Sequence, residues 1–266
     1  MGLHGLSQIN IELSSRCDKT HLCPMCGHQD QAVNPIQYGE MDYGLLETIR
    51  RQVEPGIVIS CHRDGEPTSY TRLRDALELF RGFTVSIVTH GLNLARFASD
   101  LIERCTTVTV SVFRGDQDTD AQLESVKAFL IQKGTRAPQV QIKIVGDMSP
   151  KELAPYEALG VRIIHRLIHV PIGNSKYAHR TPTVPEVGVC LDALHRPTID
   201  WQGQLFLCNR LDPQRDLLLG SMRTQSLDEL WNGPVRQQMI EHHKAGRRDL
   251  ANPLCAKCDY WGVASA

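Results

Sequence analysis

The sequence lacks long apolar runs and has no strong excess of charge of either sign. Its 266 residues include 29 lysine and arginine side chains against 30 acidic ones, so the net charge is −1. A nearly neutral chain lacks the positive footprint of a nucleic-acid-binding protein, and no apolar run is long enough to cross a membrane. The N-terminus has no basic segment followed by an apolar one, which excludes a secretory signal. We therefore expect a cytoplasmic protein that binds neither nucleic acid nor membranes.

Cysteine is the residue type whose placement is most informative. Seven of the nine cysteines form two groups near the two ends of the chain. The first group is Cys17, Cys23 and Cys26, and the second is Cys190, Cys208, Cys255 and Cys258. In a cytoplasmic protein, clustered cysteines more often bind metal than form disulfides. Three thiolates make an open metal site and four make a closed one, and structural zinc is an alternative to an iron–sulfur cluster for each group.

Strand and helix patterns alternate through the first two thirds of the chain. Strands are predicted at 9–12, 57–60, 85–88, 108–112, 140–145 and 162–168, and helices at 42–51, 70–81, 95–104, 121–133 and 150–159. Six successive strand–helix units predict an α/β fold with a parallel sheet or a partial barrel. Residues 171–188 are rich in proline, glycine and polar residues and are predicted to be a linker. A hairpin at 198–208 and a capped helix at 226–231 follow.

The cysteine loop follows the first predicted strand, and two short segments follow the next two strands. Strand two leads into Gly65-Glu66-Pro67 and strand three into Thr89-His90-Gly91. This constellation resembles the radical S-adenosylmethionine (SAM) superfamily, and the C-terminal cysteines with the 226–231 helix resemble its twitch domain, a short SPASM-like cap. The resemblance implies a partial (β/α)6 TIM-like barrel at 1–170, a linker at 171–188 and a twitch domain at 189–266.

The resemblance also implies two 4Fe–4S clusters and bound SAM. The first cluster would be held by the N-terminal cysteines and an auxiliary cluster by the C-terminal ones. Gly65, Glu66 and Pro67 would bind the methionyl amino group. Other expected cofactor contacts are Met25, Thr89, Ser111 and Lys143. The loop departs from the usual C-x3-C-x2-C pattern because it is C-x5-C-x2-C, and Met25 replaces the usual aromatic residue, which puts the adenine contact in doubt.

Within the superfamily, the chain is similar to dehydrogenases of natural product biosynthesis that oxidise an aminocyclitol alcohol. The resemblance implies a small sugar-like or aminocyclitol-like substrate, a ketone product, and an electron donor of the flavodoxin or ferredoxin type. Arg166 is the candidate for stabilising a developing oxyanion. His169 and His62 are further polar candidates, although a lone histidine is more often structural than catalytic.

Three other functions remain open from the sequence. An epimerase would need a thiol hydrogen donor, for which Cys61 is the candidate; Cys105 is expected to be structural. A peptide maturase is also possible, but we expect no room for the leader-binding domain that such enzymes usually carry. An iron–sulfur or zinc-binding scaffold is the non-enzyme alternative, and the Gly-Glu-Pro segment argues against it.

Overall fold

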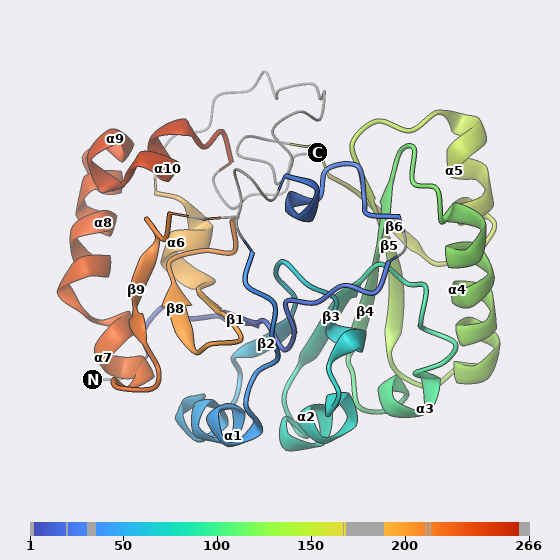
Figure 1. Cartoon of the computed structure of the whole chain (residues 1–266), viewed down its shortest axis with the longest axis horizontal. Helices are drawn as coiled ribbons and strands as arrows, with labels where there is room; N and C mark the ends of the chain where they lie inside the picture. Colours follow the sequence, from blue (N-terminus) through green and yellow to red (C-terminus); the bar gives the residue numbers. More distant parts are fainter. Residues whose placement is uncertain are drawn as a thin grey trace.

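The structure is a computed structural model, and it describes residues 3–19, 21–30, 36–166, 168, 189–210, 212 and 214–260. Six parallel strands run in sequential order across most of the sheet. They are β1 (Gln8–Ile11), β2 (Val58–Cys61), β3 (Val85–Thr89), β4 (Thr107–Phe113), β5 (Gln139–Val145) and β6 (Arg162–Arg166). The helices between them are α1 (Tyr43–Gln52), α2 (Leu73–Leu79), α3 (Ala98–Leu101), α4 (Thr119–Lys133) and α5 (Pro150–Glu157). Figure 1 shows these helices along the outside of a curved sheet, so the predicted partial barrel is confirmed.

Side-chain alternation gives the sheet an apolar outer face and a polar inner face. On β1 and β2, Ile9, Ile11 and Ile59 are completely buried in the core that the helices cover. The intervening Asn10 lies opposite Ser60 in the strand register, on the other face. The same alternation on β4 and β5 sets polar side chains on the inner face, which is the surface that can hold a polar ligand.

The C-terminal segment extends the same sheet. Strand β7 (Thr198–Ile199) pairs with β1 in parallel, and β8 (Gln204–Phe206) and β9 (Leu218–Ser221) follow as antiparallel neighbours. The predicted hairpin is therefore present, and it continues the barrel sheet to a total of nine strands. Its helices are α6 (Leu191–His195), α7 (Leu227–Trp231), α8 (Pro234–Lys244), α9 (Arg248–Ala251) and α10 (Pro253–Lys257).

Some predicted element bounds differ from the structure. The predicted helix at 70–81 is shorter, because the chain before it forms a separate 3-10 turn, η2 (Pro67–Ser69), that ends at an extended Tyr70. The predicted helix at 95–104 is reduced to α3, which ends where Ile102 becomes extended. The predicted linker at 171–188 lies outside the described residues. None of the described helices is both long and apolar enough to span a membrane.

Candidate functional site

The N-terminal cysteine loop leaves β1 at its carboxyl end and brings three thiols together. All nine cysteines are free thiols. The pKa of Cys23 is raised to about 12 and that of Cys26 to about 11. Burial is the main cause, and the neighbouring Cys17 contributes to both shifts. The 3-10 turn η1 (Gly27–Gln29) begins directly after Cys26, whose amide donates to the Cys23 carbonyl at 2.9 Å. Three sulfur donors gathered in one loop fit a soft metal centre.

A buried ion pair fixes the long part of this loop. Lys19, whose side chain is 1% exposed, contacts Asp116 at 2.7 Å and Asp118 at 3.1 Å. Both aspartates lie in the connection between β4 and α4. Lys19 stands in the five-residue spacer between Cys17 and Cys23, so the ion pair anchors the part of the loop that is longer than usual. The sequence analysis missed this contact, because nothing in the local pattern pairs residues so far apart.

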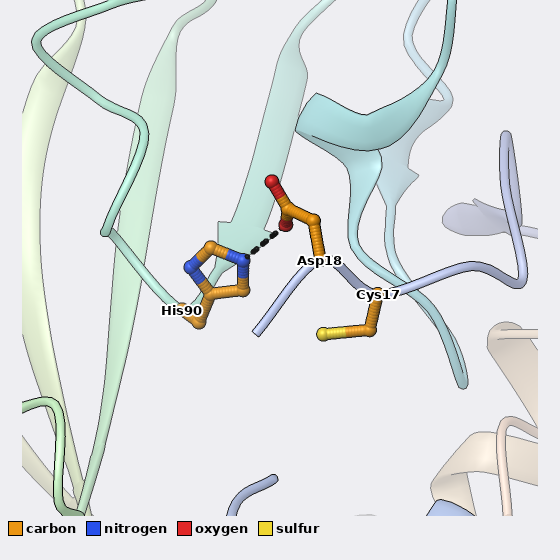
Figure 2. A group of neighbouring side chains, drawn as sticks. All are labelled: Cys17, Asp18 and His90. Atoms are coloured by element: carbon orange, nitrogen blue, oxygen red, sulfur yellow. Dashed lines mark hydrogen bonds and ion pairs between the residues drawn. The ribbon is translucent and has the colours of Figure 1, made fainter. Parts of the chain in front are cut away.

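A second set of contacts surrounds the first cysteine (Figure 2). The ligand atoms of Cys17, Asp18 and His90 lie within 4.8 Å of one another. His90 Nε2 is 3.0 Å from Asp18 Oδ1, and Asn93 Nδ2 donates to Asp18 Oδ2 at 2.6 Å. Burial acts to lower the pKa of His90, but hydrogen bonds to Asp18 and Cys17 dominate and raise it to about 10.

The Gly65-Glu66-Pro67 segment packs directly against the cysteine loop. The Glu66 amide donates to the carbonyl of Arg16 at 2.8 Å. A side chain on Gly65 would collide with the backbone of Ser14 and Ser15, so only glycine permits this approach. The segment after β2 is thus held against the residue that precedes Cys17.

The Glu66 carboxylate is 3% exposed and already accepts several hydrogen bonds. Oε1 accepts from the Thr68 amide at 3.0 Å, from the Thr68 hydroxyl at 2.8 Å and from the Thr89 hydroxyl at 2.8 Å. Oε2 accepts from the His90 amide at 2.9 Å. Oε2 also lies 3.5 Å from His90 Nε2, so a ligand amino group would share this carboxylate with several donors of the protein.

The other expected cofactor residues lie at the same end of the barrel. Met25 is half-buried in the cysteine loop, between Cys23 and Cys26. Ser111 is 8% exposed and lies opposite Lys143 in the register of β4 and β5. Burial lowers the pKa of Lys143 to about 8, and the positive charges of Arg166 and Arg210 lower it further.

The four C-terminal cysteines come from separate segments and line one pocket. Cys190 precedes α6, Cys208 follows β8, Cys255 lies within α10 and Cys258 follows that helix. Burial raises the pKa of Cys190, Cys208 and Cys255, the last to about 12, and neighbouring cysteines of the group raise each further. Four thiols around one pocket, two of them buried and two half-buried, fit a fully ligated soft metal centre, with either iron–sulfur or zinc chemistry.

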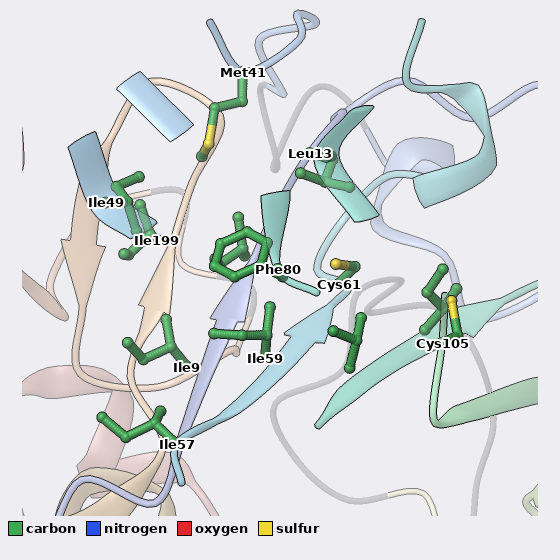
Figure 3. Close-up of a cluster of buried hydrophobic side chains, with 14 of the residues drawn as sticks. Ile9, Leu13, Met41, Ile49, Ile57, Ile59, Cys61, Phe80, Cys105 and Ile199 are labelled. Atoms are coloured by element: carbon green, nitrogen blue, oxygen red, sulfur yellow. The ribbon is translucent and has the colours of Figure 1, made fainter. Parts of the chain in front are cut away.

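The candidate catalytic residues lie in different parts of the structure. Arg166 ends β6 on the inner face, because it lies opposite Val145, two residues beyond Lys143. Cys61 is 2% exposed and lies in the apolar core with Cys105 (Figure 3), and burial raises its pKa to about 12. The structure therefore does not bring Cys61 to the inner face, because alternation places Ser60 and His62 there instead. His169 lies outside the described residues.

The fold and the two cysteine sites together define a partial-barrel protein with a metal-binding C-terminal extension of its sheet. Residues 190–259 match a family described as an iron-sulfur cluster-binding domain, SPASM. No curated protein sequence matches the chain.

Two solved proteins share the fold. BtrN in complex with AdoMet and 2-DOIA has a TM-score of 0.58 and 18% identity, over 98% of this chain and 95% of that chain. Streptococcus suis SuiB bound to S-adenosylmethionine has a TM-score of 0.69 and 15% identity, over 96% of this chain and 72% of that chain. A SuiB structure bound to precursor peptide SuiA has a TM-score of 0.67 and 14% identity, over 96% of this chain and 71% of that chain. The chain therefore shares the fold of these two proteins, and its C-terminal region matches an iron–sulfur cluster-binding domain.

Proposed function

We propose that this protein is a radical SAM dehydrogenase that oxidises a secondary alcohol of a small polar substrate to a ketone. The observation that carries the proposal is the pairing of an open three-cysteine site with a closed four-cysteine site on one continuous sheet. When bound, SAM and the clusters would supply a 5′-deoxyadenosyl radical that takes a hydrogen atom from the carbinol carbon, and an acceptor for the remaining electron.

The roles of the protein groups follow from their positions. Cys17, Cys23 and Cys26 would hold the first cluster and leave one iron without a protein ligand. Glu66 and the Thr89 hydroxyl, which donates to it at 2.8 Å, would orient the methionyl end of SAM. Lys143, on the polar inner face, would pair with the methionyl carboxylate.

The C-terminal cysteines and Arg166 would serve the oxidation itself. Cys190, Cys208, Cys255 and Cys258, which line one pocket, would hold an auxiliary cluster. Arg166 would donate to the substrate oxygen and stabilise negative charge as the hydroxyl loses its proton. We further propose an electron donor of the flavodoxin or ferredoxin type.

Iron, zinc and acid-labile sulfide per chain, measured after anaerobic purification and reconstitution, test this assignment. We expect about eight iron and about eight sulfide, which is two cubane clusters. About four iron with one zinc would retain the radical core and contradict the dehydrogenase. A preparation without iron, or one that does not form 5′-deoxyadenosine from SAM after reduction, would contradict the whole proposal.

A peptide maturase is the second candidate, and one observation favours it. SuiB bound to precursor peptide SuiA superposes with a higher TM-score, 0.67 against 0.58 for BtrN. Coverage favours the first candidate, because the chain spans 95% of BtrN and 71% of SuiB. Substrate-dependent consumption of SAM with sugar-like alcohols against peptides distinguishes the two.

The epimerase alternative requires Cys61 as a hydrogen donor. Because its thiol lies in the apolar core, we expect Cys61→Ala to retain both 5′-deoxyadenosine formation and turnover. Loss of turnover with retained 5′-deoxyadenosine formation would support the epimerase instead.

A further inference from the structure

Four basic side chains from distant parts of the sequence lie on the inner face of the sheet or beside the C-terminal cysteine pocket, which Arg210 lines. His62 follows β2, Lys143 lies on β5, Arg166 ends β6 and Arg210 follows β8. Lys143 and Arg166 share the inner face of adjacent strands, as their register shows. Burial lowers the pKa of His62 to about 3, and the charges of Lys143 and Arg210 add to this effect, so the histidine faces both cations.

These cations have few acidic partners. Among the residues that the structure describes, Lys143 and Arg166 form no side-chain hydrogen bond or ion pair. The Arg166 Nη1 atom is buried without a hydrogen-bond partner, and so is His62 Nδ1. Arg210 is 3.8 Å from Asp192, but Asp192 also lies 3.3 Å from Arg196.

The neighbouring Arg63 differs from these side chains because it is paired with acidic groups. Arg63, one residue after His62, has two acidic partners, Asp64 at 3.4 Å and Asp200 at 3.8 Å. Among the described residues, Lys143 and Arg166 have no such acidic partner, and Arg210 has only Asp192 at 3.8 Å. Burying unpaired positive charge is costly, so a cluster of this kind is stable when an anion completes it.

The cofactor supplies only part of the missing negative charge. In the proposed function, the methionyl carboxylate pairs with Lys143. Arg210 stands two residues after Cys208, and its positive charge acts to lower the pKa of that thiol. Arg166 remains, with a planar fork of five N–H donors that matches a carboxylate or phosphate group. A neutral alcohol would satisfy one of these donors.

We propose that the substrate carries an oxyanion, a carboxylate or phosphate group, which Arg166 binds on the polar inner face of the sheet. The inference rests on the proposed function and narrows its substrate class. It disfavours an aminocyclitol, because an ammonium group would be repelled by the positive charges of Lys143, Arg166 and Arg210. The substrate is then an acidic sugar or cyclitol rather than a basic one.

The first test measures the binding of inorganic phosphate to the reconstituted protein with SAM, by isothermal titration calorimetry in low-salt buffer. We expect saturable binding that weakens by about tenfold or more in Arg166→Gln, the size of effect that follows from losing one charge-assisted contact of about 1.4 kcal/mol. The matched control is Arg162→Gln, on the same strand, which is exposed and should change the affinity little. Arg166→Lys, which keeps the charge and loses the fork, should give an intermediate affinity.

The second test is displacement of phosphate by three related sugars. D-glucuronate should displace it, whereas D-glucose and D-glucosamine should not. No binding of phosphate to the unmodified protein, equal affinity in Arg166→Gln, or displacement by D-glucosamine as effective as by D-glucuronate would each overturn the inference. Circular dichroism melting of each variant identifies any loss that comes from misfolding.

Formation of 5′-deoxyadenosine is measured on the same preparations. If SAM is cleaved but phosphate does not bind, the proposed function stands and the inference fails. If phosphate binds through Arg166 but SAM is not cleaved, the anion site stands and the radical chemistry fails.

Discussion

The two cysteine sites bring their thiols together in different ways. The N-terminal site gathers its thiols from a single loop of ten residues, Cys17 to Cys26, and anchors that loop with charged side chains from elsewhere. The C-terminal site gathers four thiols from three segments between Cys190 and Cys258, and tertiary packing brings these segments together. A loop can leave a ligand position open, whereas a site enclosed by several elements is closed. The difference teaches that an open site depends on local spacing and a closed site on the tertiary fold.

Loss of one N-terminal cysteine should have the largest effect on activity. In Cys17→Ser we expect no 5′-deoxyadenosine formation and a fall from about eight to about four iron atoms per chain, because the open site loses one of its three ligands. Iron analysis and chromatography of the SAM products measure this. Cys105→Ala, which removes a buried cysteine outside both groups, is the control. Retained SAM cleavage in Cys17→Ser would remove the loop from the proposed active site.

Loss of one C-terminal cysteine should distinguish the function of the C-terminal site from that of the N-terminal site. In Cys255→Ser we again expect about four iron atoms per chain, but with 5′-deoxyadenosine still formed and the ketone product lost. Thermal stability should also fall, because ligand bonds of a buried metal centre contribute to folding. If the variant still forms the ketone at the normal rate, the auxiliary site is structural and the electron acceptor must lie elsewhere.

Disruption of the ion pair that anchors the open loop should cost stability. Lys19→Gln leaves Asp116, whose side chain is 6% exposed, without its cation, while Asp118 keeps His21 at 3.0 Å, so we expect the free energy of unfolding to fall by about 3 kcal/mol. Urea unfolding of the reconstituted protein measures this change. Lys127→Gln removes an exposed pair with Glu124 and is the matched control, with no measurable effect expected. An equal effect of the two variants would mean that the loop does not depend on this anchor.

The smallest predicted effect compares the two regions directly, because each has one helix with a complete capping box. Ser149 and Glu152 cap α5 in the barrel, and Ser226 and Glu229 cap α7 in the C-terminal segment. We expect Ser149→Ala and Ser226→Ala each to lower the melting temperature by about 2 to 4 °C. Because both regions share one sheet, the two variants should shift the same transition. Two separate transitions in calorimetry would instead show that the regions unfold independently.

Much of the fold could be predicted because its signals are local. The six strands lie within a few residues of their predicted positions, since alternation and apolar runs report burial directly. The capped helix begins after Ser226 as predicted, because a capping box spans only four residues. The helices at 70–81 and 95–104 were predicted too long. The 3-10 turn and the extended Tyr70 delay the start of α2, and the extended Ile102 ends α3, and the helical pattern reports neither.

The sequence by itself determined the spacing of the cysteine loop, the glycine that allows the close approach after β2, and the order of strands and helices. Each of these is a property of neighbouring residues and their backbone preferences. The tertiary structure alone decided that Cys61 faces the core, that the hairpin joins β1, and that Glu66 is already hydrogen-bonded. It also decided that His62, Lys143, Arg166 and Arg210 share one region. Contacts between residues so far apart depend on strand order and register, because only the folded sheet brings their side chains within Coulomb range.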